Sequence, residues 1–202
     1  MNVTLSDEGS IEGKCREQYT NHNAMIMRGN YYETNEEAFL EELEKLRDDV
    51  EVSDFSIKNG DDVSKPIMET YGFFREDAAE IIADKIYFSP LFHMAKSENP
   101  FKLEKREYPV DFGYPWEDKC NVNIEIPEGY AVESIPEPVS MVLPENLGAF
   151  KYNIIASGNQ VRVATSVRIN TAVISTLAYT SLKEFYKLMI EKQTERVVLK
   201  KI

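Results

Sequence analysis

The chain has 202 residues, of which 43% are hydrophobic and 11% aromatic, a composition typical of an ordered globular protein with one or two domains. The formal net charge is −12, and residues 1–100, with 22 acidic and 10 basic residues, account for all of it. Such an acidic surface disfavours nucleic acid and anionic membranes as partners, and no apolar run is long enough to insert into a bilayer.

The beginning of the chain predicts one strand and two helices. Weak alternation from Leu5 to Gln18 indicates an extended strand. Apolar spacing then predicts a helix over about 22–32 and an amphipathic helix over about 35–48. Thr34 and Glu37 have the spacing of a capping box, which predicts where the second of these helices begins.

Short strands follow these helices. One strand pattern leads to the Asn59-Gly60 pair, which favours a tight turn because both residues tolerate positive φ. A second strand is expected from Ile67 to Phe74. The apolar run from Ile81 to Phe88 is ambiguous, since alanines in and before its first half favour a helix.

After residue 101 the sequence shows short alternating runs separated by Pro, Gly and Asn. The expected strands are Leu103–Phe112, Asn121–Ile126, Ala131–Ile135, Ser140–Leu143, Ala149–Ala156 and Gln160–Ile169. Strands at such regular spacing are typical of a β-sandwich. A last helix is expected over about 180–193, with Ser181 and Glu184 as a second capping box, and a short strand follows it.

The predicted fold class is therefore mainly β, or α+β overall: an antiparallel β-sandwich, immunoglobulin-like in texture, with about three helices. The change of charge near residue 100 coincides with the Asn99-Pro100 pair, which is typical of a boundary. We expect an acidic α+β segment at 1–100 and a β-sandwich domain with a C-terminal helix and strand at 101–202.

The candidate nucleophiles and bases are few. Cys15 and Cys120 lie far apart in the sequence and have no metal-binding or redox spacing. They meet in a long-range disulfide, remain two inert thiols on strands or, as the least favoured alternative, include a reactive thiol. Neither begins a helix, where a thiolate would be stabilised, and neither lies beside His22 or His93 in sequence. No catalytic residue is therefore assigned.

No cofactor or metal ion is predicted either. Glycine-rich nucleotide-binding loops and nucleophile elbows are missing from the sequence. Two cysteines and two histidines without local pairing make a poor zinc site. Asp61 and Asp62 follow the Asn59-Gly60 turn and could bind calcium, but without the spacing of an EF-hand a polar turn is the simpler interpretation.

Aromatic residues offer the one candidate recognition surface. Tyr114, Trp116, Tyr31 and Tyr32 could line a groove for a sugar or a peptide. Aromatic residues on strands more often pack in a core, and Trp116, beside Pro115 in a predicted turn, is the residue whose exposure would decide between the two.

The second half of the chain resembles a known family. The resemblance rests on Asn99–Lys102, Arg106–Phe112, Ile124–Tyr130, Ser134–Pro136, and Tyr179 with the segments Leu182–Phe185, Glu191–Gln193 and Val197–Lys201; the strings PVDFGYP and IPEGY are its most distinctive parts. These segments are similar to the C-terminal domain of unknown function of large bacterial proteins that carry an N-terminal β domain and a transglutaminase-like, papain-type core. Gly9–Gly13, Ala24 and Arg28 resemble the stretch that follows the catalytic part of that core.

The resemblance implies a parent protein that is exported to the periplasm or cell surface. Met1–Ser10 itself lacks the basic start and apolar stretch of a secretory signal. The family's Cys-His-Asp triad lies upstream of the matching segments, and no cysteine or histidine of this chain falls in a matching motif. The resemblance therefore implies no enzymatic activity for this chain.

Two functional hypotheses follow. The first is a non-catalytic accessory or interaction module whose partner is a transglutaminase-like catalytic domain or another protein. The alternative is a stand-alone β-sandwich domain that binds a glycan or peptide through exposed aromatic residues. An independent hydrolase is the least favoured interpretation, because no catalytic constellation is visible in the sequence.

Overall fold

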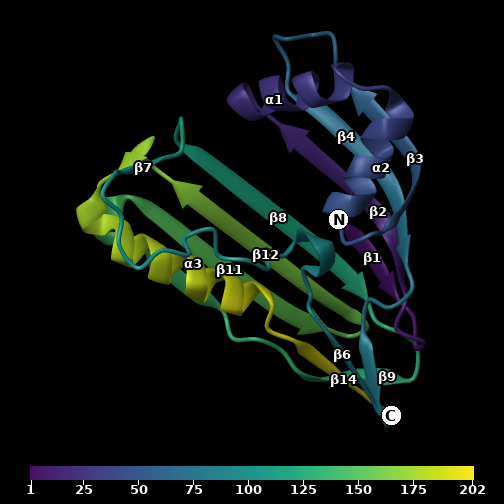
Figure 1. Ribbon diagram of the computed structural model, residues 1–202. Coiled ribbons are helices and arrows are strands. Elements are labelled where there is room, and N and C mark those ends of the chain that lie inside the picture. The colour runs from purple at the N-terminus through teal and green to yellow at the C-terminus, as the bar shows by residue number, and fades with distance from the viewer. The chain divides into compact units, whose positions relative to one another are not determined.

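The computed structural model describes residues 1–202, which divide into two compact units, Met1–Ala78 and Ala79–Ile202. The first unit is purple to blue in Figure 1, and the second runs from teal to yellow. Each unit is described by itself.

The first unit is a β-sheet with two helices. Its elements are β1 (Asn2–Leu5), β2 (Ile11–Tyr19), α1 (Asn21–Tyr32), α2 (Glu36–Leu46), β3 (Glu51–Lys58) and β4 (Ile67–Arg75). The strands lie in the order β1-β2-β4-β3, and each neighbouring pair is antiparallel.

Side chains along β2 and β4 alternate between the two faces of the sheet, and the helices cover one of these faces. Every second residue of each strand points to one face, and that face carries Tyr19 opposite Ile67. Ala24 and Met27 of α1 pack against Ile67, and partly buried residues of β2, α2 and β3 complete this small core. The helices thus cover the face that also carries Glu17 and Glu69.

The second unit contains three sheets and one long helix. Its elements are β5 (Glu80–Ile82), β6 (Lys85–Phe88), β7 (Val110–Asp111), β8 (Trp116–Glu125), β9 (Tyr130–Ser134), β10 (Val139–Val142), β11 (Gly148–Ser157), β12 (Gln160–Ile169), β13 (Val173–Ile174), α3 (Tyr179–Gln193) and β14 (Val197–Lys201), with 3₁₀ turns at Phe92–Met94, Pro144–Asn146 and Thr176–Ala178. The strand orders are β10-β11-β12-β8, β5-β6-β14-β9 and β13-β7.

The core of the second unit lies between α3 and the sheet that contains β11. Alternate residues of β8, β11 and β12 are buried on one face. The apolar stripe of α3, which includes Leu182, Phe185 and Met189, is buried as well, and α3 contacts β11 (Figure 1). In the smaller sheet, Ile86 pairs with Leu199 and both are fully buried.

The mainly β class and the three helices are confirmed, and each helix lies within two residues of its predicted bounds. The capping residues were predicted wrongly. Asn35, not Thr34, caps α2, because its side-chain oxygen accepts from the Ala38 amide at 2.9 Å. In α3 the helix already begins at Tyr179, so Ser181 lies inside it and no side chain caps it.

Three segments differ from their sequence patterns. The strand expected over Leu5–Gln18 is interrupted by the turn between β1 and β2, where Gly9 takes a positive φ of 89°. The run Ile81–Phe88 is a hairpin, with β5 and β6 joined through Ala83 and Asp84, and Ala83 takes a positive φ of 56°. Of the expected strand Leu103–Phe112, only Val110–Asp111 pairs with another strand.

The sequence placed a boundary near residue 100, whereas residues 79–100 group with the second unit in the structure. The physical reason is hydrogen bonding, since β6 pairs with β14 from the far end of the chain.

Candidate functional site

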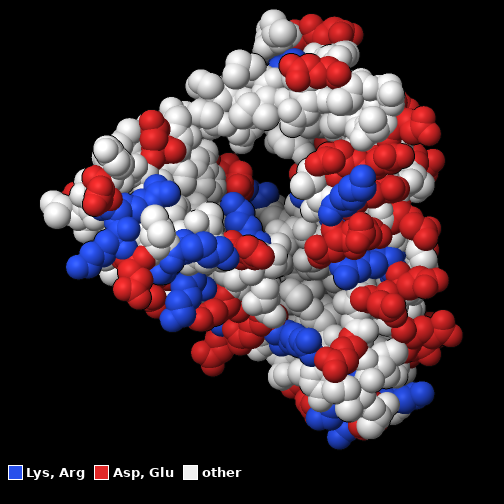
Figure 2. All heavy atoms as spheres, viewed as in Figure 1, with Lys and Arg blue, Asp and Glu red and all other residues white.

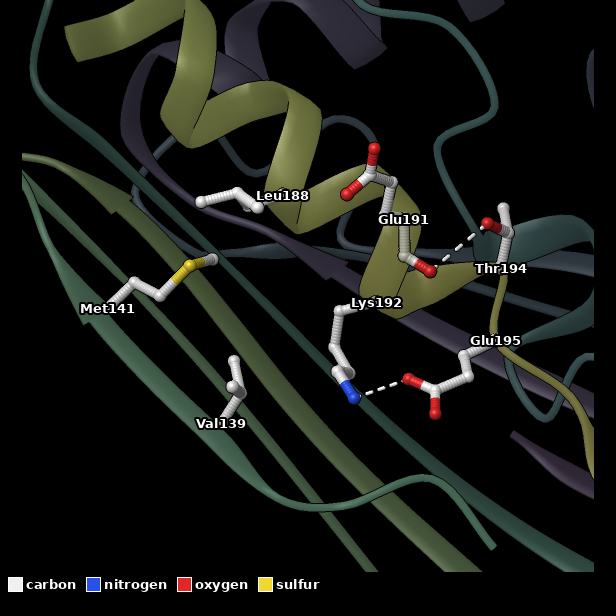
Figure 3. Close-up of a pocket in the computed structure, with 7 residues that line it drawn as sticks. All are labelled: Val139, Met141, Leu188, Glu191, Lys192, Thr194 and Glu195. Carbon is white, nitrogen blue, oxygen red and sulfur yellow. Dashed lines mark hydrogen bonds and ion pairs between the residues drawn. The ribbon is translucent and has the colours of Figure 1, made fainter.

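A groove in the second unit separates α3 from the edge strand β10. We call it the α3 groove; it is a hollow of about 370 Å³ lined by Val139, Met141, Leu188, Glu191, Lys192, Thr194 and Glu195. Figure 3 shows Val139 and Met141 rising from β10 toward the helix, with Leu188 on the opposite side. An ion pair between Lys192 and Glu195 closes one end, so the groove has an apolar middle and a charged rim.

The strand edge beside this groove has no neighbour within its sheet. β10 is the last strand in its order and pairs only with β11. The Leu143 amide donates to the Gly148 carbonyl at 2.8 Å, and antiparallel pairs alternate, so the backbone groups of Ser140 and Val142 point away from β11. Another extended segment could therefore form hydrogen bonds along this edge.

A buried hydroxyl lies below the groove. Tyr152 of β11 is opposite Val139 and only 1% exposed, and its hydroxyl has no hydrogen-bond partner. Burial, and secondly the charge of Glu195, raise the pKa of this hydroxyl. Tyr152 is therefore a neutral residue whose polar atom is unsatisfied, which is unusual in a core.

A second polar feature lies in the first unit, on the sheet face that the helices cover. We call it the Glu17 cluster; its members are Cys15, Glu17 and Tyr19 of β2, Glu69 and Tyr71 of β4, and Arg47 directly after α2. Arg47 Nη2 donates to Glu17 Oε1 at 2.5 Å, and the Tyr71 hydroxyl donates to the same oxygen at 3.2 Å. The Tyr19 hydroxyl lies 3.0 Å from Glu17 Oε2 and 3.4 Å from Glu69 Oε2.

The electrostatics of this cluster are unusual for a small domain. Glu17 and Glu69 are directly opposite in the β2–β4 register, so two carboxyl groups face one guanidinium. Burial, followed by the charge of Glu17, raises the pKa of Glu69 to about 7. Burial also raises the pKa of Cys15, whose thiol donates to Glu17 Oε1 at 3.9 Å.

The two cysteines lie in different units, Cys15 on β2 and Cys120 on β8. The two do not form a disulfide, which removes one of the alternatives that the sequence left open. Cys15 is buried within the Glu17 cluster, where its raised pKa disfavours the thiolate, while Cys120 is half-buried on β8. His22 is the second residue of α1 in the first unit, whereas His93 is buried in a 3₁₀ turn of the second.

The loop at residues 59–65, which was considered for calcium, surrounds the side chain of Arg28 instead. Arg28 of α1 donates to four backbone carbonyls of this loop, those of Asn59, Gly60, Asp62 and Lys65, at 2.8 to 3.0 Å. Asp62 accepts from Ser64 and pairs with Lys65. The guanidinium thus supplies the positive charge at the carbonyl cluster, and no group of acidic, cysteine or histidine side chains in the structure has metal-binding geometry.

The four aromatic residues lie in different units, with Tyr31 and Tyr32 in the first and Tyr114 and Trp116 in the second. Trp116 begins β8 and is half-buried; its ring packs edge-on against Phe112, and Lys96 Nζ lies 5.1 Å from its centre. Tyr114 is half-buried two residues earlier. Tyr31 and Tyr32 end α1 in the first unit.

The Tyr31 ring packs against Phe39 and Phe55. Tyr32 is 53% exposed, and its hydroxyl donates to Asp61. Tyr32 is thus the most exposed of the four.

Sequence reasoning missed both the Glu17 cluster and the α3 groove. A signal for the cluster existed, because Glu17 and Glu69 occupy inward positions in the alternating patterns of β2 and β4, where an apolar residue is expected. The groove has no such signal, since its two sides come from segments far apart in the chain.

No helix combines the length and apolarity that crossing a bilayer requires.

Comparison with curated proteins finds no match. Among solved structures, a protein from Parabacteroides distasonis described as a "putative protease" matches 48% of this chain and 19% of its own, at 12% identity and a TM-score of 0.42. Residues 84–199, more than half of the chain, match the profile of DUF3858, described as a domain of unknown function with a solved structure. The chain belongs to the DUF3858 family.

Proposed function

We propose that this chain is a non-catalytic interaction module that works beside a transglutaminase-like catalytic domain. The observation that carries the proposal is the α3 groove, where an unpaired strand edge borders apolar side chains within the residues that match the family. Leu188 is 42% exposed there although it belongs to the apolar stripe of α3. Exposed apolar surface beside a free strand edge suits an extended segment of a partner protein.

Two further points support a non-catalytic role. Cys15 is buried with a raised pKa, so its thiol stays protonated and is a weak nucleophile. The family resemblance, which rests on strings such as Pro109–Pro115, adds the expected partner and an exported parent protein in the periplasm or at the cell surface. Both the partner and the location belong to the proposal.

The direct test is binding between the purified chain and the transglutaminase-like domain encoded in the same genome, measured by calorimetry. Met141→Asp and Leu188→Asp place a charge in the apolar middle of the groove, and we expect each to weaken binding by about tenfold or more. Ile155→Asp is the matched control, because Ile155 lies on the neighbouring strand β11, is 51% exposed and does not line the groove.

Failure has two clear forms. Undetectable binding at high concentration would remove the proposed partner, and equal loss in all three variants would remove the groove as the contact surface. The absence of catalysis is tested separately: the chain should neither cleave nor cross-link peptides, and an activity abolished by Cys15→Ala or Cys120→Ala would overturn the assignment.

Glycan or peptide binding is the second candidate, and the partial exposure of Trp116 favours it. Trp116 is the only tryptophan, so its fluorescence reports directly on any ligand that stacks against it. Titration with cell-wall glycan fragments should change this fluorescence if the alternative holds, and an unchanged spectrum would remove it.

A further inference from the structure

Glu69 is among the most buried acidic side chains of the protein, with only 1% of its surface exposed. Its Oε1 atom has no hydrogen-bond partner, and its Oε2 atom has a single neighbour, the Tyr19 hydroxyl at 3.4 Å. An ionised carboxylate in such surroundings is costly, because neither oxygen is assured of a donor.

The two carboxyl groups near Tyr19 have too few hydrogen-bond donors between them. The Tyr19 hydroxyl carries one hydrogen and lies closer to Glu17 Oε2, at 3.0 Å, than to Glu69. Glu17 also receives the Arg47 and Tyr71 donors, so its charge is well satisfied. If Tyr19 donates to Glu17, then Glu69 must donate to the Tyr19 oxygen, which requires a proton on Glu69.

We propose that Glu69 is a proton-holding site of the first unit, and that loss of this proton loosens the contact between the end of α2 and strands β2 and β4. The chain of donors runs from Glu69 through Tyr19 to the ionised Glu17, which Arg47 holds. When Glu69 ionises, two carboxylates compete for one tyrosine hydrogen and one guanidinium.

The groups that face Glu69 come from three elements. β2 contributes Cys15, Glu17 and Tyr19, β4 contributes Tyr71, and the residue after α2 contributes Arg47. α1 and β3 bring apolar residues to this face of the sheet, among them Met27 and Ile57. Arg47 is thus the one cation available to two acidic groups, and its Nε atom is itself buried without a hydrogen-bond partner.

The direction of the pH effect follows from the raised pKa of Glu69. An acid that binds its proton more tightly when folded stabilises the fold at low pH, and this contribution disappears as the pH rises through the folded-state pKa. With an ordinary value of 4.5 and a folded value of about 7, the window lies between these two pH values. Across it, the folded-to-unfolded ratio should fall on the order of a hundredfold through this residue alone.

The test compares the full-length protein with Glu69→Gln, which keeps the shape of the side chain and cannot ionise. In the unaltered protein, one glutamate carboxyl carbon should titrate near neutral pH by NMR, and this signal should be missing from the variant. The ratio of wild-type to variant folding constants, from urea unfolding, should fall from pH 4.5 to pH 8. Hydrogen exchange of residues 36–47, compared with the variant at equal pH, should rise over the same range.

Two further variants separate this role from a merely structural one. Glu17→Gln removes the neighbouring charge and should lower the titration midpoint of Glu69. Glu12→Gln, at an exposed position of the same strand, should leave the midpoint unchanged. A Glu69 carboxyl that titrates below about pH 5.5, or parallel pH profiles for the wild type and Glu69→Gln, would overturn the proposal.

Discussion

Gly13 lies where β1 and β2 approach too closely for any side chain. A Cβ atom at this position would lie 2.0 Å from the Asn2 carbonyl oxygen and 2.9 Å from the Phe73 ring. The obstacle at Asn2 is backbone, which cannot move without breaking the pairing of the two strands. We predict that Gly13→Ala lowers the free energy of unfolding by about 3 kcal/mol, as measured by urea denaturation.

Gly29 provides the matched control at the residue scale. It lies inside α1, and a Cβ atom there would have Glu33 Oε1, at 4.0 Å, as its nearest neighbour. Gly29→Ala should therefore raise stability by about 0.5–1 kcal/mol, because alanine loses less backbone entropy in a helix. Equal effects of the two substitutions would contradict the close approach at Gly13.

At the scale of the element, the start of α2 depends on one side chain. Asn35 accepts the Ala38 amide, whereas the Thr34 hydroxyl donates to the Asn30 carbonyl of the preceding helix. We predict that Asn35→Ala lowers the free energy of unfolding by about 1 kcal/mol. Thr34→Ala should lower the free energy of unfolding by clearly less. If chemical denaturation shows a larger loss for Thr34→Ala than for Asn35→Ala, Thr34 is the capping residue, as the sequence suggested.

The helices and most strands could be predicted because their apolar spacing is local. The cap of α2 could not, since Thr34 and Asn35 are both good capping residues and only the path of the chain selects one. The β5–β6 hairpin could not be predicted either, because Ala83 adopts a positive φ, a conformation expected for Gly or Asn.

The candidate sites were less predictable than the elements. Glu17 and Glu69 are cross-strand neighbours from distant parts of the chain, and their proximity depends on the register of β2 and β4. Trp116 could be named from the sequence, but its neighbours Phe112 and Lys96 could be named only once the turn before β8 was known.

At the scale of the molecule, the net negative charge is concentrated in the first unit. Residues 1–78 hold 19 acidic and 8 basic residues, a net charge of −11, which leaves −1 for the second unit. Figure 2 shows acidic side chains gathered over the side of the first unit where α2 lies in Figure 1. Repulsion among these charges destabilises this unit at low ionic strength.

Salt should therefore stabilise the two units unequally. Raising sodium chloride from 10 to 150 mM shortens the screening length from about 30 Å to about 8 Å. We predict that amides of β2 and β4 gain protection from hydrogen exchange, while the thermal transition reported by Trp116 fluorescence in the second unit moves little. An equal response in both units would show that local charge does not limit the stability of the first.

The position of β14 has a consequence for synthesis in the cell. This strand lies between β6 and β9, so residues Val197–Lys201 form the inside of the smaller sheet. During translation, β6 and β9 leave the ribosome well before the strand that joins them. A nascent chain stalled before Val197 would leave the facing edges of β6 and β9 unpaired beside the apolar side chains Ile86 and Phe88, and such strand edges are prone to aggregate.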